Sequence, residues 1–211
     1  MTTDGGGWTL VAVSSDDGSD TWTWNNRHYW DTDTSTFGSL DHLHLDFKSD
    51  AFHKLVADDL LFRHAPSNIW ASYHATGNEQ TLAEQIASAG GPIAWNKDVD
   101  GFAMTAGTLT KSGDLLSTRL FFNAADQDSD SADDHAWGPT WCTSGNSVDT
   151  PFDDPGFEGS LGPLADLDQN GGLGDSQNME FSALGFGKAL GLNSGAQGTG
   201  QNHMQVYVRS Q

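Results

Sequence analysis

The 211-residue chain contains a single cysteine, Cys142. No internal disulfide can form, which excludes the small secreted folds that several disulfides hold together. Stabilisation must therefore come from an apolar core or from bound metal ions. Cys142 itself lies in no motif for nucleophilic catalysis, and its expected role is that of a small, partly buried apolar residue.

Basic residues are also scarce, because nine Lys and Arg stand against 29 Asp and Glu, for a formal net charge of -20. The resulting field repels the phosphate backbone of nucleic acids and anionic membrane surfaces, so nucleic acid is not an expected partner. The same acidic composition is typical of proteins in concentrated salt, where cations screen the self-repulsion. A halophilic source is therefore one interpretation.

Long hydrophobic runs are missing as well. No stretch has the apolar length of a transmembrane helix, so membrane insertion is not expected. Residues 1–4 lack the basic and apolar regions of a signal peptide. We expect an extracellular or virion-surface location, reached after removal of an upstream part or without a classical export route.

The chain nevertheless has enough apolar material for a core. Hydrophobic residues make up 36%, and eight Trp and eleven Phe compensate for this low share, because each buried aromatic ring removes a large area from water. No linker-like stretch divides the sequence, so residues 1–211 are predicted to form one domain.

Hydrophobic periodicity predicts mostly strands. Alternating or β-branched patterns occur at 8–13, 60–64, 69–73, 115–123, 179–184 and 203–209, and a turn around Pro66 makes the second and third of these a hairpin. Helical spacing is confined to a segment near 82–89 that stops at Gly90, and to a weaker one within 50–59. These patterns predict an α+β fold with a mixed or antiparallel sheet and few short helices.

Residues 124–178 show almost no periodicity, and alternating aspartates begin this stretch at Asp126, Asp128 and Asp130. Converging carboxylates repel each other unless a hard cation neutralises them, and Ca²⁺ accepts such oxygen ligands in flexible geometry. The spacing predicts a calcium site, with a solvated acidic loop as the alternative. It is not an EF-hand, because Ser131 and Trp137 occupy the positions of the required Gly and bidentate Glu.

A second acidic loop contains Asp166, Asp168 and Asn170, followed by the Gly that permits a sharp turn in calcium loops. The twelfth position is not a carboxylate, so Asp175 or Glu180 would have to complete the site. An Asx-rich surface turn is the alternative interpretation.

A third acidic group, Asp153 and Asp154, could add ligands to the first ion or bind an ion of its own. Glu158 is close enough in sequence to join this group, and we count it among the candidate ligand-binding residues.

His135, Trp137 and Trp141 flank the first acidic stretch. An aromatic face beside a calcium ion can pack against the apolar face of a sugar while the ion binds its hydroxyls. These residues are therefore candidate ligand-binding residues. In the alternative, the two Trp form the core of a metal-bound loop and His135 satisfies a carbonyl.

No enzyme is expected. The sequence has no Gly-x-Ser-x-Gly elbow, and its other histidines lack the spacing of a zinc site.

Several short motifs resemble those of a known family. The stretch Thr-Thr-Asp-Gly-Gly-Gly-Trp-Thr-Leu-Val at 2–11 resembles the opening of a fibrinogen-related C-terminal domain. Segments at 36–39, 46–49, 59–62 and 80–82 are similar in order and spacing to the intelectin-like branch. In the second half, the resemblance is limited to 121–123, the aspartates at 126–130, 152–156 and 206–209.

This resemblance implies a mixed α+β globule whose calcium-bearing, loop-rich subdomain binds glycans or acetylated groups beside the ion. It implies no catalysis, and family members generally act as oligomers. The expected division is an N-terminal and central sheet region at 1–123, a calcium and ligand loop subdomain at 124–178 and closing strands at 179–211. Animal members carry several disulfides, so this chain departs from the family in having one cysteine.

Together, the acidic loops and the resemblance predict a non-catalytic, calcium-dependent recognition or adhesion domain that binds glycans or a cell-surface receptor. The alternative is a structural or receptor-binding component of a virion, such as a fibre tip or a surface decoration, that uses the fold for assembly. A homo-oligomer is expected in both cases.

Overall fold

The computed structural model describes residues 2–15, 17, 19, 21, 28–65, 68–74, 79–88, 102–108, 119–126, 135–141 and 203–211. Its strands are β1 (Thr9–Ser15), β2 (Phe47–Lys48), β3 (Asp59–His64), β4 (Ile69–His74), β5 (Phe102–Gly107), β6 (Arg119–Asp126), β7 (His135–Trp141) and β8 (His203–Arg209). The helical segments are α1 (His28–Asp31), α2 (Leu82–Ser88) and the 3-10 turns η1 (Thr3–Gly5), η3 (Leu40–His42) and η4 (Asp50–His53).

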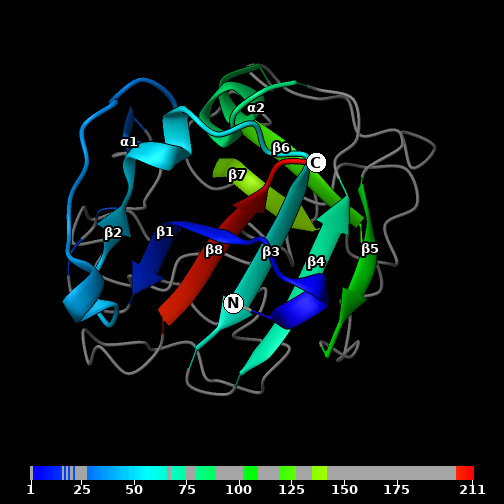
Figure 1. The fold of residues 1–211 in the computed structure, drawn as a ribbon. Helices are drawn as coiled ribbons and strands as arrows, with labels where there is room; N and C mark the ends of the chain where they lie inside the picture. The colour runs from blue at the N-terminus through cyan, green and yellow to red at the C-terminus, as the bar shows by residue number, and fades with distance from the viewer. Residues whose placement is uncertain are drawn as a thin grey trace.

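The strands form one 8-stranded sheet in the order β2-β1-β8-β3-β4-β5-β6-β7. Every neighbouring pair is antiparallel. The last strand, β8, lies between β1 and β3, so the first and last strands are side by side, near the β2 edge of the sheet (Figure 1). The predicted antiparallel sheet with few short helices is confirmed for the described residues.

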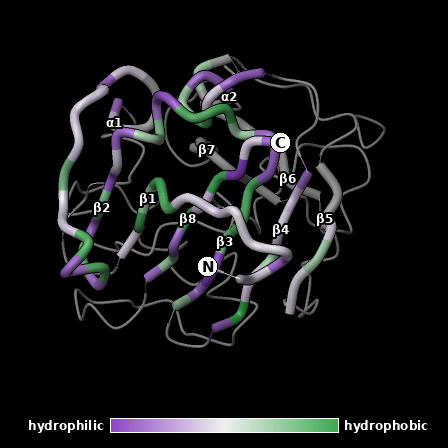
Figure 2. The backbone as a smooth tube through the Cα atoms, in the orientation of Figure 1, coloured by the Kyte–Doolittle hydropathy of each residue, from purple (hydrophilic) through white to green (hydrophobic). Residues whose placement is uncertain are grey.

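One face of the central strands carries the main core. Side chains alternate between the faces of a sheet, and this alternation brings Leu60 and Phe62 of β3 together with Val206 and Val208 of β8, all 0% exposed. The apolar stretches of β1 and β3 stand out in the middle of the sheet (Figure 2). Burying each such side chain contributes about 1.5–3 kcal/mol, so this layer is the main source of stability.

Short helical segments cover this face. Phe52 of η4 and Leu82 of α2 are fully buried in the same cluster. Helix α2 begins with a capping box, in which the Glu84 amide donates to the Thr81 hydroxyl at 3.2 Å and the Thr81 amide donates to the Glu84 carboxylate at 2.8 Å. The predicted helix near 82–89 and the hairpin of β3 and β4 are therefore confirmed. No helix in the described ranges is long and apolar enough to cross a membrane.

Two predictions are wrong. The aperiodic stretch predicted from residue 124 contains the end of β6 and all of β7. Gly138 and Pro139 lie within β7, and such residues normally argue against a strand. Pro139 pairs with Phe122 on an edge strand of the described sheet, where its missing N–H can be tolerated.

The helix predicted within 50–59 is also wrong, because it is only the 3-10 turn η4. Its N-cap, Ser49, makes no side-chain hydrogen bond to the turn. Val56 instead forms an isolated antiparallel bridge to Thr81, and the chain then enters β3. Tertiary pairing therefore overrides the local helical spacing here.

Candidate functional site

Four of the predicted site residues lie in the β6–β7 hairpin. Its register pairs Asp126 with His135, Ala124 with Trp137 and Leu120 with Trp141. Paired positions, and alternate positions along one strand, share one face of a sheet. The positions of Asp126, His135, Trp137 and Trp141 therefore follow one another along one face of the hairpin, and β7 is at the edge of the described sheet.

The other predicted site residues lie outside the described residues. They are Asp128, Asp130, Asp153, Asp154, Glu158, Asp166, Asp168, Asn170 and Asp175. Within the ranges that are described, no group of three or more His, Cys, Asp and Glu side chains is arranged to hold a metal ion.

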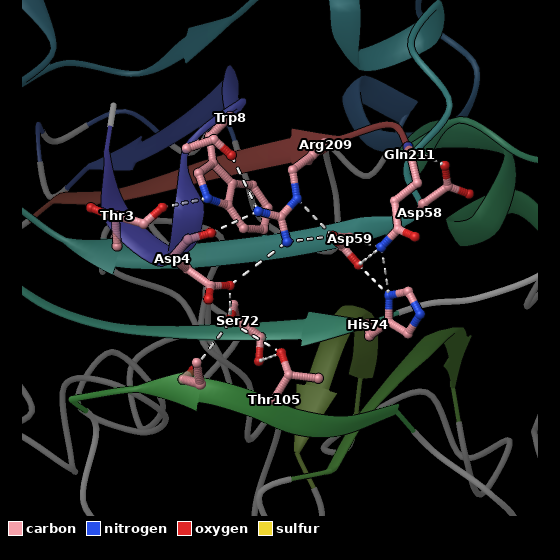
Figure 3. A network of polar contacts seen from close by, with 12 residues as sticks. Thr3, Asp4, Trp8, Asp58, Asp59, Ser72, His74, Thr105, Arg209 and Gln211 are labelled. Carbon is pink, nitrogen blue, oxygen red and sulfur yellow. Dashed lines mark hydrogen bonds and ion pairs between the residues drawn. The ribbon is translucent and has the colours of Figure 1, made fainter.

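A second polar arrangement, not identified from the sequence, lies on the sheet face opposite the main core (Figure 3). The strand register produces this arrangement, because Asp59 of β3 is paired with Arg209 of β8 on one side and with His74 of β4 on the other. Three titratable side chains are therefore neighbours across three adjacent strands.

Arg209 makes most of the contacts. Its Nε and Nη2 donate to Oδ2 of Asp59 at 2.7 Å and 2.6 Å. Its Nη1 donates to the carbonyls of Asp4 at 2.7 Å and Gly6 at 3.2 Å. The guanidinium also lies over the Trp8 ring, 4.2 Å from the ring centroid. One side chain thus joins the N-terminal turn to the two central strands.

The backbone of the N-terminal turn explains the run of three glycines. Gly5, Gly6 and Gly7 have φ values of 81°, 84° and 78°, a region that side chains with a Cβ disfavour. This path brings the Asp4 and Gly6 carbonyls to Arg209, while the Trp8 indole N–H donates to the Thr3 carbonyl at 2.8 Å. The glycines therefore allow the turn to fold back over β8.

Asp59 is the electrostatic centre of this arrangement. Its side chain is 4% exposed. Burial alone would raise the pKa of Asp59, but hydrogen bonds from His74, Arg209 and Gln211 outweigh burial and lower the pKa below its usual value. The carboxylate therefore stays ionised and binds its three neighbours.

An aspartate that orients a histidine is also found in catalytic sites. Here both oxygens of Asp59 are engaged, Oδ1 by His74 and Oδ2 by Arg209. Ser72, on the same face, donates its hydroxyl to Asp4 Oδ2 at 2.9 Å and lies 3.1 Å from the Thr105 hydroxyl (Figure 3). We therefore interpret Asp4, Trp8, Asp59, His74 and Arg209 as a structural unit, which we call the terminal clamp.

The described surface also has a shallow groove of about 540 Å³ next to β1, β2 and η4. It is lined by Thr9, Leu10, Leu40, Phe47, Ser49, Asp50, Ala51, Lys54 and Leu55. Leu40 is 66% exposed, and Lys54 and Asp50 form a 2.7 Å ion pair. The groove is suited to apolar contacts, and no predicted site residue lines it.

Comparison with known proteins adds no assignment, because no family model and no curated protein matches the chain.

Proposed function

We propose that the chain is a calcium-dependent recognition domain that binds glycans or a glycosylated cell-surface receptor. The observation that carries the proposal is the register of the β6–β7 hairpin, which aligns one acidic, one imidazole and two indole positions on one face. Acidic ligands beside aromatic residues are the combination that a calcium-assisted sugar site needs.

Asp126, Asp128 and Asp130 would hold the ion, because carboxylate oxygens are the donors that Ca²⁺ prefers. The bound ion would accept sugar hydroxyls as ligands. Trp137 and Trp141 would offer apolar ring surface to the C–H face of the same sugar. The position of β7 at the edge of the described sheet suits this role, because no described strand lies beyond it.

The antiparallel sheet is compatible with the family expectation behind this proposal, and the glycine turn at 5–7 gives the opening motif a structural role. The glycine run and Trp8 belong to the opening motif that resembles fibrinogen-related domains, and both take part in holding β8. The opening motif therefore contributes to holding β8 in the sheet.

Calcium binding is tested by isothermal titration calorimetry of Ca²⁺ into chelator-treated protein, at both low and high salt because of the net charge. We expect Asp126→Asn combined with Asp128→Asn to weaken binding at least about tenfold, since each lost charge removes a favourable contact to the ion. The matched control is Asp41→Asn, an exposed aspartate in η3. Equal calcium affinity in the double variant and the control would refute this site.

Ligand binding is tested on a glycan array with calcium and with chelator. A calcium-dependent hit should weaken by about tenfold or more in Trp137→Ala and in Trp141→Ala, which corresponds to about 1.4 kcal/mol per contact. His44→Asn, at an exposed residue away from the hairpin in sequence, should bind as wild type. A hit that survives chelator and both Trp substitutions would contradict the proposal.

The second candidate is the virion component, which the single cysteine favours because the fold needs no oxidising compartment. Light scattering after size-exclusion chromatography, combined with the glycan array, distinguishes the two. A calcium-independent oligomer without any glycan or receptor ligand would favour assembly, whereas a monomer would count against both candidates.

A further inference from the structure

Lys48 of β2 is a basic side chain in the interior of an acidic protein, because it is 0% exposed. Its Nζ lies 5.6 Å from the centroid of the Phe37 ring and 5.9 Å from those of Tyr29 and Phe52. A cation within about 6 Å of aromatic faces is attracted to them. The rings thus attract the charged ammonium, whereas burial acts against the charge and lowers the pKa of Lys48 from its ordinary value of 10.5.

Three acceptors surround this ammonium. Nζ donates to the Tyr29 carbonyl at 2.9 Å and to the Asp33 carbonyl, and it lies 3.3 Å from Nε2 of His53 in η4. An ammonium has three donors and no acceptor. The contact with Nε2 of His53 is therefore a hydrogen bond only when Nε2 presents its lone pair, which requires a neutral imidazole.

Two of these contacts hold the segment 28–35, which contains α1. Tyr29 and Asp33 belong to this segment, and Lys48 reaches both of their carbonyls from β2. The segment's other end is anchored differently, because Phe37 and Lys48 exchange backbone hydrogen bonds of 3.2 Å and 3.0 Å. Loss of the ammonium contacts would therefore weaken the attachment of 28–35, leaving the packing of Tyr29 against the main core and the bridge at Phe37.

We propose that His53 is a proton-operated latch: the neutral ring completes the binding of the Lys48 ammonium, and protonation of the ring releases segment 28–35 from the sheet. Protonation removes the third acceptor and places a second positive charge beside a buried one. Both changes oppose the closed arrangement.

The groups that face His53 act in both directions. Burial, followed by the charge of Lys48, lowers the pKa of His53, whereas the Asp33 carbonyl and the carboxylates of Asp33 and Asp50 raise it. Among the described residues, His28 of α1 also acts on Asp33. The lowering effects prevail, so the pKa of His53 lies below its ordinary value of 6.5.

The direction of the pH effect follows from the lowered pKa of His53 in the closed state. In the released state the ring recovers its ordinary affinity for protons, so that state binds a proton more readily than the closed state. The closed state is therefore fully favoured above the ordinary pKa of 6.5 and loses stability as pH falls below it. Acidification is the opening signal.

Residue-resolved amide exchange tests the latch, with rates corrected for the intrinsic effect of pH. The Thr32 and Asp33 amides both donate to the His28 carbonyl and report on the segment. Their protection should fall between pH 7.5 and pH 5.0, because the released state binds a proton more readily than the closed state. Protection of the Phe37 amide and of β3 should not change.

Two variants and a control isolate the cause. His53→Gln keeps an acceptor that does not titrate in this range, so its Thr32 and Asp33 protection should not depend on pH. Lys48→Met should show low protection at both pH values. His44→Gln, at an exposed histidine, should respond as wild type.

A fall in protection that is the same in His53→Gln and wild type would overturn the proposal, as would wild-type protection that does not change with pH. If His53→Gln does not fold, the ring of His53 is titrated by NMR in the wild-type protein. Its midpoint must coincide with the loss of protection at Thr32, and a midpoint elsewhere overturns the latch.

Discussion

Replacing Arg209 by Met removes the central side chain of the terminal clamp. The substitution leaves Asp59, whose side chain is 4% exposed, as a buried carboxylate without its two guanidinium contacts. Breaking a buried ion pair from one side costs about 3–5 kcal/mol. Arg209 is itself 24% exposed, which places the expected cost at the lower end of that range.

Two smaller effects change the free energy of unfolding of Arg209→Met in opposite directions. The guanidinium over the Trp8 ring contributes about 0.5–1 kcal/mol, which is lost. Methionine restores part of the apolar contact with the same ring. We therefore expect Arg209→Met to lower the free energy of unfolding by about 3–4 kcal/mol, a large part of the roughly 5–15 kcal/mol of a typical domain.

Urea unfolding followed by far-ultraviolet circular dichroism measures this loss, and an unchanged m-value would show that the unfolded state is the same. Asp59→Asn removes the negative charge that Arg209→Met leaves buried without its cationic partner. The double variant Arg209→Met with Asp59→Asn should lose at least about 1.5 kcal/mol less than the sum of the single losses. A loss below about 1 kcal/mol for Arg209→Met, or strict additivity in the double variant, would refute the reasoning.

Three further predictions concern the described residues. The pKa of Asp59 is lower in the folded protein than its usual 3.8. Its contribution to stability is therefore present above pH 3.8 and is lost as pH falls through the folded value. In urea unfolding at a series of pH values, Asp59→Asn should reduce the loss of stability at acidic pH. Thr81→Ala removes the capping box of α2 and should cost about 1 kcal/mol in urea unfolding, whereas Thr81→Ser should cost less. Gly38→Ala should cost about 2 kcal/mol or more in thermal or urea unfolding, because φ is +76° there and a Cβ would lie 2.9 Å from the Phe47 Cα; a cost near zero would contradict the backbone conformation.

Local patterns predicted the parts of the fold that depend on short-range contacts. The alternation in 60–64 and 69–73 around a turn became the β3–β4 hairpin, whose strands are neighbours in sequence and in the sheet. The helical spacing of Leu82 became α2, supported by its capping box. Such elements are recognisable because their hydrogen bonds or their pairing lie within one short window.

The terminal clamp could not be predicted in this way. Asp4 and Arg209 are separated by 205 positions, and their contact exists only because β8 is inserted between β1 and β3. The sequence analysis noted the glycine run before Trp8 and the closing strand that ends in Arg209 as separate motifs. Considering the two together could have predicted the terminal clamp. The strand predicted at 115–123 overlaps β6, but β7 was missed for another reason, since Gly138 and Pro139 conceal a strand at the edge of the described sheet.

Stability and recognition are expected to be separable in this fold. The terminal clamp spans β8, β3 and β4, whereas the candidate recognition positions lie on β6 and β7, at the far end of the sheet order. Three to four strand spacings of about 5 Å each separate Asp59 from the hairpin. Substitutions this far apart, without shared partners, usually act independently.

Arg209→Met should therefore leave the calcium and glycan affinities of the folded fraction within about twofold of wild type, measured by calorimetry well below its melting temperature. A tenfold loss of affinity in folded Arg209→Met protein would show that the clamp also positions the hairpin.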